Sequence, residues 1–509
     1  MTDNIKAVWG VPIQYRDHHI PEAELELMRQ KVDVLADDCL LALHEKHISV
    51  DKFIAFISEK DVFSYGDVRI QAFATEVLAQ PEWLNWELLR EGQNIFLKYH
   101  GSAALGLFYV SLVGGFGAPK ITKVLDATSY MTKHRDATFK RMTETLEMII
   151  DCVDADGSLR PGSRGFSSVL KVRFLHSRVR LSLLGKLRGF RESKSSNQHD
   201  EDSAGGCPFN QGFHQSARIV LQDSSTEKLI SFAESSKAAS PSGDDGSTCS
   251  SSGAGPSSEI PKNNSSSEQS CTRQEWDSKY YGMPINQEDM MVTLLTFSVE
   301  VLRTVERLTF KGTLTTLEVD SYLHLWRYIG YLIGMHEDIN PCTAKDRAYG
   351  LYECTSAHLL KPDKRSGQLA RHLLSAASGR PPVPISYELH SEIARALLGD
   401  ELSDALGIER NFMGRIYAIF VLRSVTVLTY FLQSSSTPDS ARIKRVKAVL
   451  RLHVNTVLYS SKNNPNTREK KKKSEVSVYR WLLGRAAMVT VGVGVVYIAG
   501  GFTRASIKS

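Results

Sequence analysis

The sequence predicts an all-α fold, interrupted by a disordered Ser-rich insertion and followed by a C-terminal transmembrane helix. Three observations carry this prediction. Apolar residues recur at helical spacings of three and four along much of the chain, whereas runs that alternate apolar and polar residues are scarce. A long stretch near the middle is dominated by Ser. A stretch near the end is apolar and almost free of charge.

The helical stripes are clear in seven segments, namely Glu22–His44, Arg69–Leu78, Thr138–Val153, Ser167–Leu184, Glu288–Leu308, Ser321–Met335 and Asn411–Leu432. The helix after Pro284 has a readable start, because Asn286 can cap it and Asp289 stands at the third helical position. Two further apolar stretches, Ala103–Ala118 and Ile416–Leu432, are expected to be core helices. The first is rich in Gly and ends before a Pro, and the second contains an Arg.

The Ser-rich stretch divides the helical domain. Roughly 22 of about 80 residues between Glu192 and Thr272 are Ser, so too little apolar surface is available to offset the entropy of ordering. We therefore expect a first part of the domain, a disordered insertion, a second part, a basic linker and a span, with the bounds 17–191, 192–275, 276–435, 436–480 and 481–502.

The apolar stretch Trp481–Phe502 has one charge, Arg485, which can reach the membrane surface as Trp481 can. A span needs about 20 apolar residues, so this is a short single span. Lys470–Lys473 precede it, and positive residues mark the cytoplasmic side. We expect a cytosol-facing body held by a tail anchor. The alternative is a buried terminal helix or strand rich in Val and Gly.

Charge and cysteine content exclude other classes. The chain of 509 residues has a net charge of +5, but its basic residues gather after Arg442, so we expect no nucleic-acid partner. The 7 cysteines form no CxxC pair, which is typical of reduced thiols in a cytosol-facing protein. No Walker loop, HExxH or GxSxG motif is present, and no GxGxxG follows a predicted strand.

His176 is the candidate metal ligand. It lies on an apolar helical stripe that also contains Val169, Val172, Val179 and Leu183. A lone histidine on such a stripe is more often a core residue with a satisfied hydrogen bond than a ligand. Arg173 and Arg180 flank the imidazole along the helix, where they could pair with acidic groups of a bound anion or reach solvent.

A second helix, Ala137–Cys152, places Arg141 and Thr145 on one stripe, so both could face the same cavity. By spacing alone, Arg141 and Glu144 would form a surface salt bridge, which is usually worth less than about 1 kcal/mol.

Seven short motifs occur in one order between about Asp67 and Gln433. They are GQ at Gly92, SLVGGFGAP from Ser111, RMTET from Arg141, VRFLHSRVR from Val172, GMPINQEDMMVTLLTFS from Gly282, YLHLWRYIGYLIGMHEDINP from Tyr322 and LLGDELSDALGI from Leu397. With these motifs the chain resembles the family of latex-clearing rubber oxygenases and fungal MpaB-type membrane-bound oxygenases.

The resemblance implies a globin-like haem domain, in which a b-type haem iron activates O₂ to cleave or oxidise a hydrophobic, isoprenoid-like substrate. The family's V-R-x-x-H motif places the proximal iron ligand at His176, and its R-x-x-x-T motif places the distal residues at Arg141 and Thr145. Rubber-cleaving members have Lys directly before that Thr, whereas this chain has Glu144. We assign Arg173 and Arg180 to the haem propionates from their spacing, not from the family.

Two other functions stay open at this stage. One is a non-catalytic, membrane-tethered haem-binding or scaffold protein whose Ser-rich insertion binds partners. The other is a peroxidase-like oxidase that uses the same pocket. The fungal relatives imply the endoplasmic reticulum, although a short, basic-flanked tail also suits mitochondrial or peroxisomal membranes. Neither the substrate nor the oligomeric state follows from the sequence.

Overall fold

The structure is a computed structural model of the whole chain. It describes residues 6–14, 17–57, 64–128, 131, 134–154, 157–187, 276–310, 314–380, 384–434 and 439–459. The Ser-rich insertion (192–275) and the expected span (481–502) lie outside the described residues, and so does the second half of the basic linker. The division of the chain into these parts therefore stays a prediction.

The described elements of the first part are β1 (Lys6–Val8), β2 (Val11–Ile13), α1 (Glu22–Met28), α2 (Val34–Glu45), α3 (Val50–Phe56), α4 (Val68–Leu78), α5 (Trp86–Lys98), α6 (His100–Leu105), the π-helix η2 (Gly106–Gly114), α7 (Pro119–Thr128), α8 (Arg135–Val153) and α9 (Arg164–Leu183). Those of the second part are α11 (Ser278–Tyr281), α12 (Gln287–Arg307), α13 (Thr316–Leu332), the 3₁₀ turn η5 (Pro341–Thr343), α14 (Lys345–Leu359), α15 (Lys364–Ala377), α16 (Tyr387–Leu398), α17 (Asp400–Ala405), α18 (Phe412–Ser434) and α19 (Asp439–Tyr459). The all-α prediction is confirmed, since β1 and β2 form a single short antiparallel pair among these residues.

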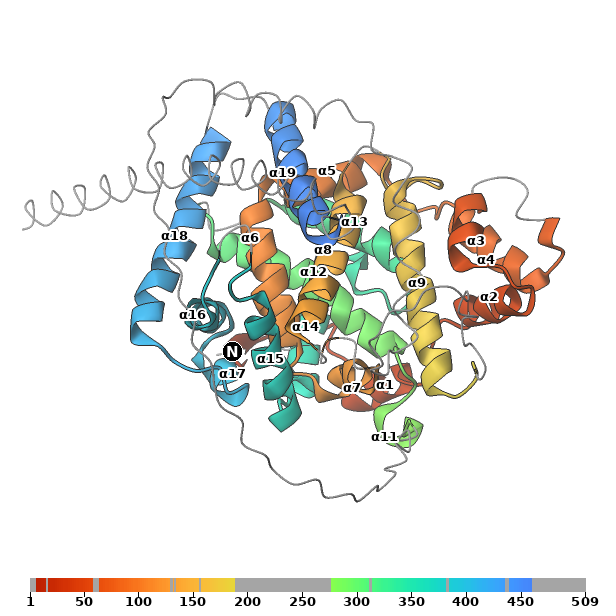
Figure 1. Cartoon of the computed structure of the whole chain (residues 1–509), viewed down its shortest axis with the longest axis horizontal. Coiled ribbons are helices and arrows are strands. Elements are labelled where there is room, and N and C mark those ends of the chain that lie inside the picture. Colours follow the sequence, from red (N-terminus) through yellow and green to blue (C-terminus); the bar gives the residue numbers. More distant parts are fainter. Residues whose placement is uncertain are drawn as a thin grey trace, which may run out of the picture.

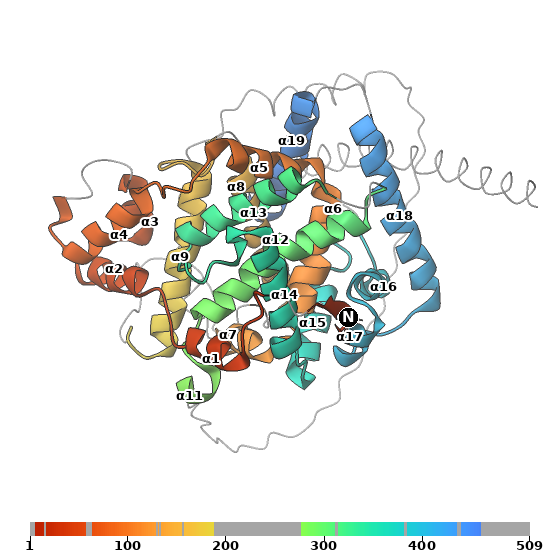
Figure 2. The same cartoon turned by 180° about the vertical axis from the view of Figure 1, so that it is seen from behind.

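Helix α12 lies at the centre of the molecule, with helices of both parts around it (Figures 1 and 2). Most of its residues are buried on every side, as expected for a helix enclosed by others. Its start is as predicted: Asn286 and Asp289 form a reciprocal capping box. Helices α2, α3 and α4 form one end of the molecule, and α18 lies at the opposite edge in both views.

Helices α5 and α13 join the two parts at close range. Gly92 of α5 lies against the backbone of α13, and a Cβ there would collide with the carbonyl oxygen of Ser321 and lie 2.9 Å from the Cβ of Leu325. The next residue, Gln93, donates from Nε2 to the carbonyl of Cys152 at 2.7 Å and to Oγ of Ser158 at 2.8 Å. The GQ motif therefore packs α5 against α13 and ties it to the end of α8.

The predicted helix Glu22–His44 is wrong as a single element. The structure has two helices there, α1 and α2, because the chain turns between them and Asp33 caps the second by accepting from the backbone N–H of Ala36. Arg29, in the turn, is fully buried and pairs with Glu288 of α12. The apolar spacing alone predicts that the helix continues through Arg29. The ion pair with a residue far along the chain is not visible in that spacing.

The core position expected for Ala103–Ala118 is confirmed, because Ala103, Tyr109 and Val113 are all buried. The same expectation for Ile416–Leu432 is wrong, since α18 exposes many of its large apolar side chains. Within the described residues, Phe412–Phe431 is the one helix that is long and apolar enough to cross a membrane, and 22% of its most apolar stretch is buried. The bent pair His100–Gly114 and Pro119–Thr128 would pass the same test together.

The close contact at Gly92 generates the first prediction. Gly92→Ala should lower the free energy of unfolding by about 1–3 kcal/mol, because the added methyl group meets rigid backbone of α13. Thermal unfolding of the full chain measures this. Gly115→Ala is the matched control, since a Cβ there meets nothing within 4 Å and the residue has a helical φ of −59°. Equal melting temperatures for the two variants would contradict the account.

Candidate functional site

Helix α9 contains His176, whose imidazole has a buried nitrogen with an unmade hydrogen bond in the described part of the chain. Nδ1 of the imidazole is buried and has no hydrogen-bond partner among the described residues. Burial, together with the nearby charge of Arg180, lowers the pKa of the imidazole to about 4, against a smaller opposing effect of Asp33. The ring is therefore neutral at physiological pH, which is the form that binds metals.

The residue as a whole is only half-buried, although Nδ1 is covered. Its accessible surface therefore lies on atoms other than Nδ1. A core histidine would have a satisfied hydrogen bond, so the structure does not support that interpretation of the stripe.

Arg173 and Arg180 lie about one turn before and after His176 on α9, and both are paired with the protein's own carboxylates. Arg173 donates from Nε to Asp33 and from Nη2 to Glu76, each at 2.7 Å. Its Nη1 is buried and has no partner among the described residues. Of the two arginines, Arg173 therefore keeps a donor group for a bound carboxylate.

Arg180 is fully engaged. Its Nε and Nη2 each donate to Asp37 at 2.7 Å, and its Nη1 donates to the carbonyl of Ile285 at 2.9 Å. Because all three of its nitrogens have protein acceptors, Arg180 acts here as a structural tie between α9, α2 and the start of α12. The sequence analysis expected these arginines to meet a bound anion or solvent, whereas their acidic partners in the structure are protein carboxylates at α2 and on α4.

Helix α8 contributes Arg141 and Thr145. Arg141 donates from Nη1 to Glu144 Oε2 at 2.6 Å, and the Thr145 hydroxyl donates to the carbonyl of Arg141 at 3.1 Å. The arginine and glutamate side chains are 12% and 9% exposed, so this pair is not the surface salt bridge that the spacing indicated. Oε1 of Glu144 is buried without a hydrogen bond among the described residues, 3.9 Å from Nζ of Lys140.

The polar contacts between α8 and α9 set their relative position. Arg164, at the start of α9, contacts Glu147 and Asp151 near the end of α8, each at 2.9 Å. Ser168 donates to Asp151 at 2.5 Å one turn later. These contacts hold the first turns of α9 against the last turns of α8.

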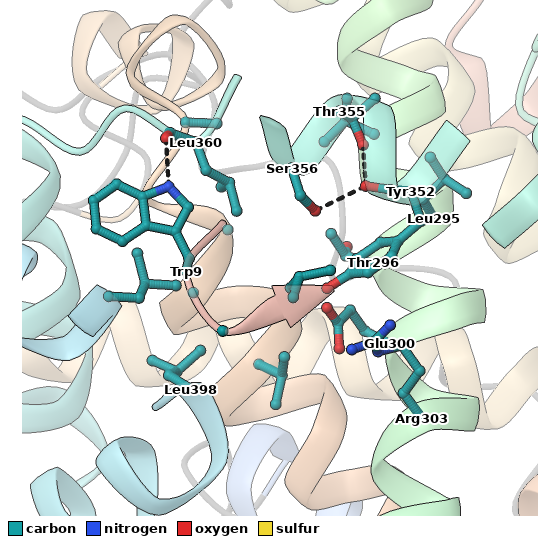
Figure 3. A pocket seen from close by; sticks show the side chains of 18 of the residues that line it. Trp9, Leu295, Thr296, Glu300, Arg303, Tyr352, Thr355, Ser356, Leu360 and Leu398 are labelled. Carbon is teal, nitrogen blue, oxygen red and sulfur yellow. Dashed lines mark hydrogen bonds between the residues drawn. The ribbon is translucent and has the colours of Figure 1, made fainter. Parts of the chain in front are cut away.

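A cavity in the described part of the chain lies elsewhere (Figure 3). Its volume is about 110 Å³, and it is bordered by β2, η2, α12, α14, α16 and α17. Trp9 closes one side and donates from Nε1 to the carbonyl of Leu360 at 2.8 Å. Burial raises the pKa of Glu300, which lines the cavity, against the opposing charges of Arg303 and Arg307. Sequence reasoning missed this cavity, because its walls come from six separate segments.

Multi-residue metal sites are not found in the described part of the chain: no group of three or more His, Cys, Asp or Glu side chains there could hold an ion. The four described cysteines, Cys39, Cys152, Cys342 and Cys354, are free and buried, which agrees with the expected reduced thiols. A metal held at His176 would therefore have one protein ligand from the described residues, as a haem iron does.

An all-α fold and a neutral imidazole whose Nδ1 has no partner among the described residues do not by themselves define a class of protein. Comparison with known proteins is more specific. Residues 270–428 match the family model described as ER-bound oxygenase mpaB/B'/Rubber oxygenase, catalytic domain. The match confirms the resemblance seen in the motifs. It spans α11 to most of α18 and does not include α8 or α9.

One similar solved structure is titled "Structure of Latex Clearing Protein LCP in the closed state". It has 16% sequence identity and a TM-score of 0.49, and the alignment covers 84% of this chain and 91% of that chain. No curated protein sequence matches the chain.

The tie made by Arg180 generates the second prediction. Arg180→Met should lower the free energy of unfolding by about 3–5 kcal/mol, because it leaves Asp37 beside α9 without its partner. Urea unfolding of the full chain measures the loss. The double variant Arg180→Met/Asp37→Leu should recover much of it, and Arg410→Met, which breaks an exposed pair with Asp404, should change little. If the Arg180 variant behaved like the Arg410 variant, the tie would not hold α9.

Proposed function

We propose that this chain is an oxygenase that uses O₂ to oxidise a hydrophobic, isoprenoid-like substrate, with a b-type haem held by His176. The family match at residues 270–428 carries the proposal. The part of the chain outside that match supplies its own support. The helix that resembles the family's proximal helix has a neutral, half-buried histidine whose buried Nδ1 has no hydrogen-bond partner among the described residues.

The residues around His176 fit a haem. A histidine that held an iron would need to be neutral and to have an uncommitted ring nitrogen, and His176 meets both conditions among the described residues. The half-buried Val172 and Leu175 provide apolar surface on the same helix. When bound, the haem supplies the redox chemistry that activates O₂. Nη1 of Arg173 is the donor that we assign to a propionate. For Arg180 we propose the structural role only.

The chain's own residues would orient and polarise the reactants. Asp33 and Asp37 hold α9 through Arg173 and Arg180, so the direction of the imidazole is fixed before any substrate binds. On the adjoining helix, Arg141 is the N–H donor and Thr145 the hydroxyl donor that we place on the distal side. Glu144 accepts from Nη1 of Arg141 in this structure, so that N–H would have to leave Glu144 before it could donate to a reactant.

A non-catalytic haem-binding protein is the second candidate, and one observation favours it. The Arg141–Glu144 pair neutralises the cation on α8, where rubber-cleaving relatives have a Lys in place of Glu144. A distal side without a free cation would bind haem but turn over slowly. The membrane attachment through residues 481–502, and the choice of the endoplasmic reticulum over other membranes, are further parts of the proposal that rest on the sequence.

The third prediction concerns the axial ligand. His176→Ala should remove stoichiometric haem from the full chain purified in detergent, because the only proposed protein bond to the iron is lost. Absorbance in the Soret region and pyridine haemochrome titration measure haem per chain. His100→Ala is the matched control, since that half-buried histidine already has a hydrogen bond to the carbonyl of Leu97 at 3.0 Å. Unchanged haem content and absorbance in the His176 variant would contradict the assignment.

The fourth prediction separates the two candidate functions. Arg141→Ala should slow O₂ uptake by about 10- to 100-fold while haem content stays constant, because a charge-assisted hydrogen bond is worth about 1.5–3 kcal/mol. Glu144→Gln should raise the rate, since it releases the arginine from its ion pair. Arg135→Ala, on the same helix but bonded to the carbonyl of Ser375, is the control. Haem-loaded protein that is inactive in both the parent and the Glu144 variant would support the non-catalytic candidate.

A further inference from the structure

Helix α18 exposes an apolar face at the edge of the molecule (Figures 1 and 2). Its outward side chains are large and each is 50% exposed or more; they are Phe412, Met413, Ile416, Tyr417, Ile419, Phe420, Tyr430 and Phe431. Together with Phe310, whose ring lies 5.6 Å from that of Tyr430, we call these residues the α18 face. Half-exposed side chains of this size add up to several hundred Å², which marks an interaction surface.

The opposite side of α18 carries the small residues. Gly414 and Ala418 are buried, as are Thr426 and Thr429, and they allow α18 to pack closely on α16. A Cβ at Gly414 would lie 3.0 Å from Cγ of Glu392 on α16. Leu422 is also buried on this side, but many of the large apolar residues of α18 lie outside, where an ordinary amphipathic surface helix has polar ones.

Two observations argue against a transmembrane role for α18. One whole side of the helix is packed on the protein, and Asn411, just before it, donates from its backbone N–H to Glu392 at 2.5 Å. Arg423 is exposed in the middle of the apolar face. At the centre of a span this arginine would be costly, but in a helix that lies flat at the membrane surface it reaches the head groups.

The neighbouring sequence identifies the surface that the α18 face meets. Lys444 and Arg445 are exposed on α19, which follows α18 directly, and Lys470–Lys473 come after it. Positive residues that follow an apolar face in the sequence favour a surface of anionic lipid head groups as its partner. Residues 460–480 separate the end of α19 from the expected span at Trp481, so at about 3.5 Å per residue the chain can place the end of α19 no more than some 75 Å from the bilayer.

We infer that the α18 face is a membrane-docking surface, which lies in the head-group region of an anionic bilayer and fixes how the protein sits on it. This contact is separate from the proposed tail anchor: the tail holds the chain near the membrane, whereas the α18 face sets its orientation. The inference rests on the proposed membrane attachment and does not depend on the proposed oxygenase chemistry.

The test uses the full chain in vesicles of 80% phosphatidylcholine and 20% phosphatidylserine. Phe420→Cys carries an environment-sensitive fluorophore, and nitroxide-labelled phosphatidylcholine is the quencher. Val68→Cys is the matched control, because Val68 is 77% exposed on α4 at the opposite end of the molecule. Cys207, Cys249 and Cys271 are changed to Ser in both proteins, and the four described cysteines are buried. Flotation of the vesicles reports attachment independently of the probe.

The expected result is that both proteins float with the vesicles, that the probe at position 420 is quenched most strongly by a shallow nitroxide, and that the probe at position 68 is not quenched. Flotation without quenching at position 420 would overturn the inference while leaving the tail anchor intact. Failure to float would overturn both membrane proposals, and the haem measurements would be unaffected.

A second measurement tests whether a second copy of the chain, or the chain's own tail, occupies the α18 face. A bismaleimide cross-linker is added to the unlabelled Phe420→Cys protein in the same vesicles. Cross-linked dimers, together with an unquenched probe in the labelled sample, would show that a second copy covers the α18 face. Coverage by the chain's own tail would appear as an unquenched monomer. Either result would contradict the inference, whereas a quenched, uncross-linked monomer supports it.

Discussion

The attachment of α9 to α2 is the constraint on which the rest of the site depends. Two arginines on α9 are fully buried, and each is held by an aspartate at α2, Arg173 by Asp33 and Arg180 by Asp37. Buried charges are stable only when they are paired, so these contacts fix the orientation of α9 about its own axis. His176 lies between the two arginines in sequence. Its direction is therefore fixed by ion pairs that do not involve the imidazole itself.

The same contacts connect α9 to the centre of the molecule. Arg180 also donates to the carbonyl of Ile285, a residue with φ of 51°, which a β-branched side chain rarely adopts. The next residue, Asn286, caps α12, and Gln287 bonds the carbonyl of Gly334 just after α13. The hydrogen bond from Arg180 offsets part of the free-energy cost of this backbone conformation at Ile285. The segment that matches the oxygenase family and the helix that carries His176 thus meet in one buried polar network.

Local sequence was sufficient to predict the helices. It was insufficient to predict which residues from distant parts of the chain contact one another. The spacing of apolar residues placed α8, α9 and α12 within a few residues, and the cap at Asn286 was readable because capping involves four consecutive residues. The break between α1 and α2 was missed because Arg29 pairs with Glu288, far along the chain. Arg173 and Arg180 were recognised as neighbours of His176, but their carboxylate partners come from other helices. The outward apolar face of α18 was missed for a related reason. The spacing of apolar residues shows which residues share one side of a helix, but it does not show which side packs against the rest of the protein.

The measurement that tests the central claim most directly is an absorbance spectrum of the purified full chain, recorded as isolated, after dithionite and after carbon monoxide. The account predicts a Soret band at about one haem per chain that shifts with both additions, as expected for an iron with one histidine ligand and an accessible opposite side. A chain that takes up no haem, even after reconstitution with haemin, would contradict it and leave the orphaned imidazole of His176 without the role proposed here.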